Sequence, residues 1–192
     1  MRKLNRIFLV SIMLFSIFAL KSCVSNSSFS QEELKFVNPY LKSDTAIFKS
    51  SQGLLDTIMF ASNIVDTVKV RNLSQGYYNE NILRVTYKLT SNSFHKLFQQ
   101  SVSSELVDFI SFSKVKNSHS SKEISFLGLL FDTDYLEELI KTNTSDNIIF
   151  KGDKAQYTDL NINKGIKSFT FNFTKGVISF IDDDNSEWLR VN

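Results

Sequence analysis

The sequence predicts a mostly β fold: an antiparallel sheet, arranged as a sandwich or a curled half-barrel, with one or two short helices. Apolar and polar residues alternate at period two along most of the chain after residue 40. Short polar turns separate these runs, and only one later segment has a clear helical pattern. Strand–turn–strand order of this kind favours an antiparallel sheet over alternating βαβ units. The length of 192 residues fits one folded domain, which we expect to span residues 31–192.

The first elements of this domain are a short helix and a series of strands. Residues 31–37 form one or two helical turns, which the Asn38-Pro39 pair ends. Short strand-like runs follow at residues 45–50, 55–62, 66–71 and 81–90, separated by the turn at residues 51–53 and by Asn63. The alternation is clearest in residues 81–90, which predicts a strand with one face in the core.

The middle of the chain contains one ambiguous segment and one clear helix. Residues 94–102 fit either a helix or a strand, and the alternation of their apolar residues favours a strand. Residues 106–115 and 123–131 are strand-like, and the polar loop at residues 116–122 joins them as a hairpin. Residues 135–141 form the predicted helix, because Asp134 and Glu137 have the spacing of a capping box.

The C-terminal region predicts a three-stranded meander. In residues 166–173, Phe169, Phe171 and Phe173 share one face. The chain turns at residues 174–176 and returns along residues 177–181, and a second turn at residues 182–185 leads to a strand at residues 187–191. A fully buried Phe contributes about 1.5–3 kcal/mol, so this stripe is a candidate part of the core.

The N-terminus has the layout of an export signal. Residues 1–6 carry three cations and no acid, and residues 7–20 are apolar except for two Ser. At about 1.5 Å per residue, a helix over residues 7–20 reaches roughly 21 Å, which is shorter than the ~30 Å hydrocarbon core of a bilayer. A basic start followed by a short apolar run is typical of a secretory signal peptide rather than a spanning helix. We therefore expect residues 1–22 to be a signal peptide.

The segment Leu20-Lys21-Ser22-Cys23 resembles the cleavage box of bacterial lipoproteins. Leu20 fits the aliphatic position and Ser22 the small one, whereas Lys21 departs from the pattern. The resemblance implies that the only Cys of the chain, Cys23, carries a lipid that attaches the protein to a membrane. Residues 23–30 would then be a flexible tether. Residues 157–160 and 166–189 also resemble the C-terminal part of small Bacteroidota-type lipoproteins with no assigned activity, and this likeness implies no site residues.

Processing at this box changes the charge of the protein. The whole chain has 22 Lys and Arg against 20 Asp and Glu, but four of the cations lie in residues 1–22. The mature part keeps 18 cations against 20 acids, a net charge of −2, which gives no electrostatic reason to bind nucleic acid. No acidic run follows Cys23, and this favours the periplasmic face of the outer membrane over the cell surface. We therefore expect a lipid-anchored protein of the cell envelope.

The sequence contains no recognisable catalytic constellation. Cys23 is assigned to the lipid, and no Gly-x-Ser-x-Gly motif is present. The two histidines, His95 and His119, are interpreted as solvated or hydrogen-bonded side chains, and the six glycines are scattered singly, so no phosphate-binding loop is predicted. We expect no enzymatic activity and no cofactor.

Two groups of residues are weak candidates for binding. Asp182, Asp184 and Glu187 carry oxygen ligands for a hard cation such as Ca²⁺, but they lack the spacing of an EF-hand and fit a solvated turn better. Asp132 and Asp134 are weaker candidates still. Tyr77, Tyr78 and Trp188 are candidates for a stacking platform, although we favour core or rim positions for all three.

Three functions agree with these observations. The first is a lipid-anchored envelope protein that acts by binding or by structural contact, with a protein partner in the envelope. The second is a periplasmic carrier that holds an apolar ligand on the concave face of the half-barrel, which the many Phe residues suggest. The third is a hydrolase of envelope polymers, which needs carboxylates, or His119 with an acid, in one cleft.

Overall fold

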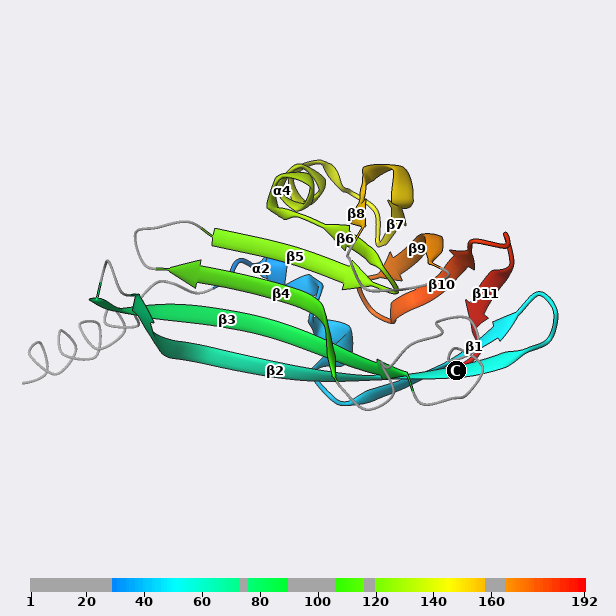
Figure 1. Cartoon of the computed structure of the whole chain (residues 1–192), viewed down its shortest axis with the longest axis horizontal. Coiled ribbons are helices and arrows are strands. Elements are labelled where there is room, and N and C mark those ends of the chain that lie inside the picture. Colours follow the sequence, from blue (N-terminus) through cyan, green and yellow to red (C-terminus); the bar gives the residue numbers. More distant parts are fainter. Residues whose placement is uncertain (1–28, 73–75, 90–105, 116–119, 158–164) are drawn as a thin grey trace, which may run out of the picture.

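The computed structural model describes residues 29–72, 76–89, 106–115, 120–157 and 165–192. Eleven strands in these ranges form one antiparallel sheet that curls into a half-barrel (Figure 1), which confirms the predicted fold class. The strand order is β7-β9-β10-β11-β1-β2-β3-β4-β5-β6-β8. The strands are β1 (Asp44–Ser50), β2 (Leu55–Asn72), β3 (Gly76–Leu89), β4 (Val107–Val115), β5 (Ser120–Phe126), β6 (Leu129–Phe131), β7 (Asn147–Lys151), β8 (Gln156–Tyr157), β9 (Ile166–Asn172), β10 (Gly176–Asp182) and β11 (Glu187–Arg190).

The two edges of this sheet are joined by a short turn. The edge strands β7 and β8 are consecutive in the chain, and the 3-10 turn η2 (Gly152–Lys154) connects them. Phe131 on β6 and Phe150 on β7 contact each other across this seam, with their ring centroids 4.9 Å apart. The sheet therefore curls far enough for side chains from its two ends to pack together.

Several predicted strand boundaries are wrong. β3 begins at Gly76 rather than at residue 81, and β5 begins at Ser120, within the predicted loop at residues 116–122. The runs at residues 55–62 and 66–71 form a single strand, β2, because Asn63 pairs with Arg84 of β3 and the ladder continues, with a register shift between Val65 and Val68. The run at residues 123–131 folds back on itself instead of continuing. Leu127 and Gly128 have φ values of 45° and 93°, so the chain makes a two-residue hairpin turn between β5 and β6.

Other expectations are confirmed. Strands β9, β10 and β11 form the predicted C-terminal meander, and β4 pairs with β5 as a hairpin. The N-terminal helix α2 (Gln31–Lys35) ends before the 3-10 turn η1 (Asn38–Tyr40). The ambiguous segment at residues 94–102 lies outside the described residues.

The predicted helix at residues 135–141 is α4 (Thr133–Thr142), but its cap differs from the expectation. Asp132 is the N-cap, and its Oδ1 accepts a hydrogen bond from the backbone N–H of Tyr135 at 3.2 Å. Asp134 lies inside the first turn, so the capping box with Glu137 is not formed. Asp132 takes this role because its extended backbone places its carboxylate at the open end of the helix.

The concave side of the half-barrel is occupied by the N-terminal segment of the folded domain. Phe36, Val37 and Tyr40 are at most 1% exposed. The Tyr40 ring lies 4.7 Å from the ring of Phe60 on β2 and 5.7 Å from that of Phe109 on β4, measured between centroids. The concave face, to which the carrier hypothesis assigned a ligand, is thus filled by Tyr40 of η1 and by the residues between α2 and η1.

A hydrogen bond and a glycine fix Tyr40 in this position. The Oη of Tyr40 accepts a hydrogen bond from the backbone N–H of Val177 at 2.8 Å. Gly176 lies next to it with φ +77°, and a Cβ atom at this position would overlap the end of the Tyr40 ring. The turn into β10 therefore requires glycine for two reasons, its backbone conformation and the space taken by Tyr40.

Candidate functional site

A half-open cavity of about 330 Å³ lies at the edge of the core, between α2, the C-terminal end of α4 and the turn from β9 to β10. Twelve residues line it: Glu32, Lys35, Phe36, Leu139, Ile140, Asn143, Thr144, Ser145, Asp146, Ile148, Phe173 and Thr174. Its volume is at the lower end of the range of about 300–1,000 Å³ that small-molecule sites occupy.

The lining of this cavity includes five apolar side chains. Phe36 and Ile148 are buried and belong to the main core. Leu139, Ile140 and Phe173 are half-buried and pack against that core. Apolar side chains left half-covered around a concavity provide surface that an apolar group of a ligand can cover.

The remaining lining residues are polar and carry both signs of charge. Glu32 and Lys35 come from α2, and Asp146 comes from the loop before β7. The Lys35 ammonium lies 6.0 Å from the centroid of the Phe173 ring, at the limit of a cation–π contact. The cavity thus joins apolar surface to polar groups, as a site for an amphiphilic molecule requires.

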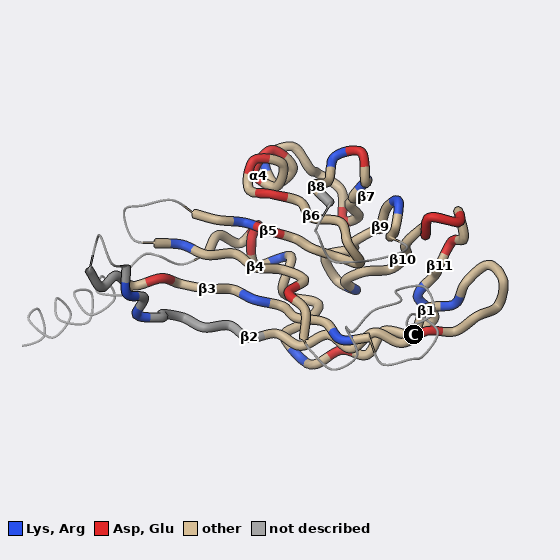
Figure 2. Tube along the Cα trace, in the orientation of Figure 1, with Lys and Arg blue, Asp and Glu red and all other residues tan. Residues whose placement is uncertain are grey.

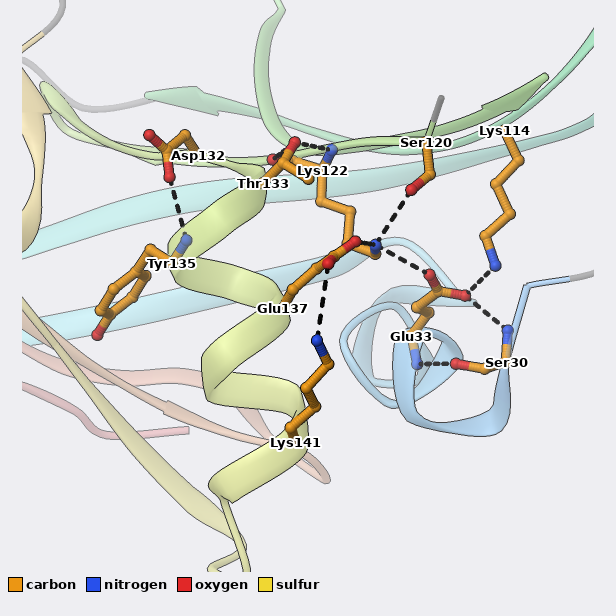
Figure 3. Close-up of polar contacts among 10 residues, drawn as sticks. All are labelled: Ser30, Glu33, Lys114, Ser120, Lys122, Asp132, Thr133, Tyr135, Glu137 and Lys141. Atoms are coloured by element: carbon orange, nitrogen blue, oxygen red, sulfur yellow. Dashed lines mark hydrogen bonds and ion pairs between the residues drawn. The ribbon is translucent and has the colours of Figure 1, made fainter. Parts of the chain in front are cut away.

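Beside the cavity, a network of charged side chains connects α2 to the sheet and to α4 (Figure 3). Glu33 on α2 has a side chain that is only 5% exposed. Its Oε2 accepts a hydrogen bond from Lys114 Nζ on β4 at 2.6 Å, and its Oε1 lies 3.7 Å from Lys122 Nζ on β5. Lys122, with a side chain 8% exposed, also donates a hydrogen bond to Glu137 Oε1 on α4 at 2.8 Å.

The environment of Glu33 favours its charged form. Burial alone would raise the pKa of its carboxyl, but the hydrogen bonds from Lys114 and from the Ser30 backbone N–H, together with the charges of Lys114 and Lys122, lower it. The Ser30 hydroxyl in turn accepts a hydrogen bond from the Glu33 backbone N–H, which completes a capping box. The pKa of Glu137 is also lowered, chiefly by the hydrogen bond from Lys122.

This network positions the two helices that border the cavity. The backbone N–H and C=O of Lys122 both bond to the Thr133 hydroxyl at the start of α4, at 2.9 Å and 3.2 Å. Lys122 of β5 therefore holds α4 through both its backbone and its side chain, and its ammonium also forms an ion pair with Glu33 of α2. Sequence reasoning missed this network, although the Ser30-x-x-Glu33 spacing was a visible capping-box signal.

Several residues predicted from the sequence lie outside the described part of the structure. These are the lipid-attachment residue Cys23, the cleavage-box residues Leu20, Lys21 and Ser22, and the histidines His95 and His119. The side chains of Tyr77 and Tyr78 are also outside it. The hypotheses that rest on these residues stay predictions.

The acidic turn between β10 and β11 uses one of its carboxylates inside the fold. Asp182 is 7% exposed; its Oδ1 accepts from the Ser186 backbone N–H at 2.8 Å and its Oδ2 from Trp188 Nε1 at 3.1 Å. Asp184 and Glu187 are exposed. Within the described ranges, no three His, Cys, Asp or Glu side chains are grouped so that they could hold a metal ion.

Trp188 is a core residue rather than part of a stacking platform. It is 2% exposed and stacks on Phe180, with centroids 5.6 Å apart and rings inclined by 11°. Its indole N–H bonds to Asp182, so both its apolar and its polar parts are satisfied within the protein.

No family model matches this chain, and no curated protein or solved structure shows significant similarity to it. In the part of the chain that the structure describes, no helix combines the length and the apolar character needed to cross a membrane.

Proposed function

We propose that this chain is a lipid-anchored protein of the bacterial cell envelope, attached to the membrane through Cys23, and that it binds the apolar part of a ligand in the cavity between α2 and α4. The anchor rests on the sequence: the basic start, the short apolar run and the box at Leu20–Cys23. The periplasmic face of the outer membrane is the location that this sequence favours.

The observation that carries the binding role is the cavity itself. Half-buried Leu139, Ile140 and Phe173 form an apolar surface that solvent reaches through the open side, and the buried residues Phe36 and Ile148 complete the apolar lining. Covering such a surface with an apolar chain gains about 25 cal/mol for each Å² removed from water. Lys35 and Asp146 at the same cavity offer contacts to a polar head group.

This proposal moves the predicted ligand site from the concave face to its edge. Tyr40 and Phe36 fill the concave face, whereas the neighbouring cavity has room for a ligand without any change in the core. The hydrolase alternative stays a prediction, because His119, one of its candidate residues, lies outside the described residues.

The anchor is tested by labelling with palmitate in a bacterial host. We expect the wild-type chain to incorporate label and Cys23→Ser to lose it. Globomycin, which blocks the lipoprotein signal peptidase, should shift the wild-type chain to its unprocessed size. Unchanged labelling of Cys23→Ser contradicts the anchor.

The cavity is tested by titrating the full chain in detergent with cis-parinaric acid, a fatty acid whose fluorescence rises in apolar sites. We expect saturable binding that Leu139→Arg weakens and that Thr174→Trp, which fills the cavity from its exposed edge, also weakens. Leu54→Arg is the matched control, because Leu54 is 51% exposed in the turn between β1 and β2, away from the cavity. Equal binding by all four proteins contradicts this site.

A further inference from the structure

The convex side of the half-barrel carries an apolar surface of its own, which we call the outer face. Six apolar side chains on β2, β7, β10 and β11, or directly after β11, are between 37% and 57% exposed: Leu55, Met59, Ile149, Ile181, Leu189 and Val191. Residues next to them on the strands are buried in the core, for example Ile58, Phe180 and Trp188. A sheet face that leaves several apolar side chains about half exposed is a candidate interaction site.

Strand register aligns part of this surface in one row. Leu55, Lys49 and Leu189 are direct neighbours on β2, β1 and β11. From Leu189 the row continues through Ser179, Thr170 and Ile149 on β10, β9 and β7. Leu189 thus lies near the middle of the row, with small polar residues on one side and Lys49 on the other.

Two opposite charges stand next to Leu189 on this face. Lys49 pairs directly with Leu189, and Glu187 precedes Leu189 by two residues on the same strand. With strands about 4.8 Å apart and alternate residues about 6.7 Å apart, the Cα atoms of Lys49 and Glu187 are roughly 8 Å from each other. Both side chains are exposed, and neither forms an ion pair within the residues that the structure describes.

We propose that the outer face binds a second copy of this chain in a two-fold symmetric dimer. In a two-fold symmetric interface every contact between two different residues occurs twice, once in each direction. A two-fold axis that runs between Lys49 and Glu187 places each Lys49 opposite Glu187 of the second copy. The same axis passes close to Leu189, so the two Leu189 side chains pack against each other at the centre.

The charges favour a second copy over a membrane as the occupant. Acidic residues gather at α4 and at the β10–β11 turn, whereas Lys and Arg are spread along the strands (Figure 2). At the outer face, an anionic lipid surface would attract Lys49 but repel Glu187 and the adjacent acidic turn. A copy of the same face satisfies both charges, and it covers the aliphatic residues with similar residues.

The first test is site-specific cross-linking of the full chain in membranes with a short bismaleimide. We expect Leu189→Cys to give a dimer several times more efficiently than Lys151→Cys, which is exposed on the same face but far from the axis. Wild-type protein controls for linkage through Cys23. A Leu189→Cys product with a different protein, or yields no higher than those of Lys151→Cys, overturns the proposal.

The second test is the apparent mass of the full chain in detergent, measured by sedimentation. We expect the wild type to have twice the mass of one chain. Lys49→Glu and Glu187→Lys should each weaken the dimer by roughly tenfold, because each places like charges in contact, and the double reversal should restore it. A monomeric wild type, or a double reversal as weak as the single changes, overturns the proposal. Neither test depends on the ligand cavity.

Discussion

Replacing Gly176 by Ala should destabilise the protein far more than the same change at Gly53. Both glycines have positive φ, +77° and +84°, so an Ala side chain is strained at either position. At Gly53 an added Cβ meets nothing within 4 Å. At Gly176 it would overlap Tyr40, which is fully buried among aromatic rings and has no space into which to move.

The magnitude follows from three separate costs. The left-handed backbone conformation costs about 1–2 kcal/mol for a residue with a Cβ, and this is the whole expected loss for Gly53→Ala. At Gly176, forcing Tyr40 aside overpacks the core, which costs about 1–3 kcal/mol. Moving Tyr40 also leaves the Val177 backbone N–H without its partner, which costs about 1–3 kcal/mol. We therefore expect Gly176→Ala to lose about 2–6 kcal/mol more than Gly53→Ala.

The assay is urea unfolding followed by the fluorescence of Trp188, the only tryptophan of the chain. If the free energy of unfolding falls with urea concentration at the same slope in all three proteins, then the difference in midpoint reports a difference in stability alone. If Gly176→Ala loses no more free energy of unfolding than Gly53→Ala, then the Tyr40 ring does not pack tightly against Gly176.

Three further predictions concern buried polar groups. Glu33→Gln should cost roughly 1–3 kcal/mol at neutral pH, because half-buried Lys114 loses its charged partner while Lys122 keeps Glu137. The lowered pKa of Glu33 means that the wild type loses this stability only as pH falls below about 4.5. Burial raises the pKa of Tyr87 to about 12 and that of Tyr40 further, so the free energy of unfolding should fall as pH rises above 10. Asp182→Asn should cost roughly 1–3 kcal/mol, because both Asp182 oxygens accept hydrogen bonds, and the NH₂ of an Asn would put a donor against either the Trp188 N–H or the Ser186 backbone N–H.

Each of these predictions has an outcome that contradicts it. If Glu33→Gln loses stability at low pH as steeply as the wild type does, then the Glu33 carboxyl does not cause the loss of stability in acid. Tyr87→Phe should flatten part of the fall above pH 10, and an unchanged curve would assign the fall to other groups. Asp182→Asn with wild-type stability would mean that the hydrogen bond to Trp188 contributes nothing.

The fold could be predicted from the sequence wherever one face of an element is buried and the other is not. Residues 81–90 and 166–173 alternate clearly because Leu83, Val85 and Phe169 point into the core while their neighbours do not. The turn between β5 and β6 was missed because it has one glycine and a Leu at φ 45°, which is not a turn residue by composition. The length of β2 was missed because Asn63, a residue depleted in strands, is held there by pairing with β3.

The candidate site was much less accessible to sequence reasoning. Glu33 and Lys114 are 81 positions apart, and no local pattern indicates that they meet. The cavity is formed by α2, the end of α4 and the β9–β10 turn, which only the curl of the sheet brings together. The acidic turn gave a visible signal, but Asp182 serves the fold, because an indole N–H in the core needs an acceptor.

The pairing of β1 with β11 has a consequence for how the chain is made. Phe48 of β1 lies beside Arg190 of β11, so nearly the whole chain separates two neighbouring strands. A ribosome releases β1 long before it reaches Glu187, and until then one side of β1 has no partner in the sheet. Contacts of such large sequence separation slow folding, since a long loop must close before they form. A premature stop codon ahead of β11 would therefore leave not a slightly shorter protein but a nascent sheet with an open seam through its middle.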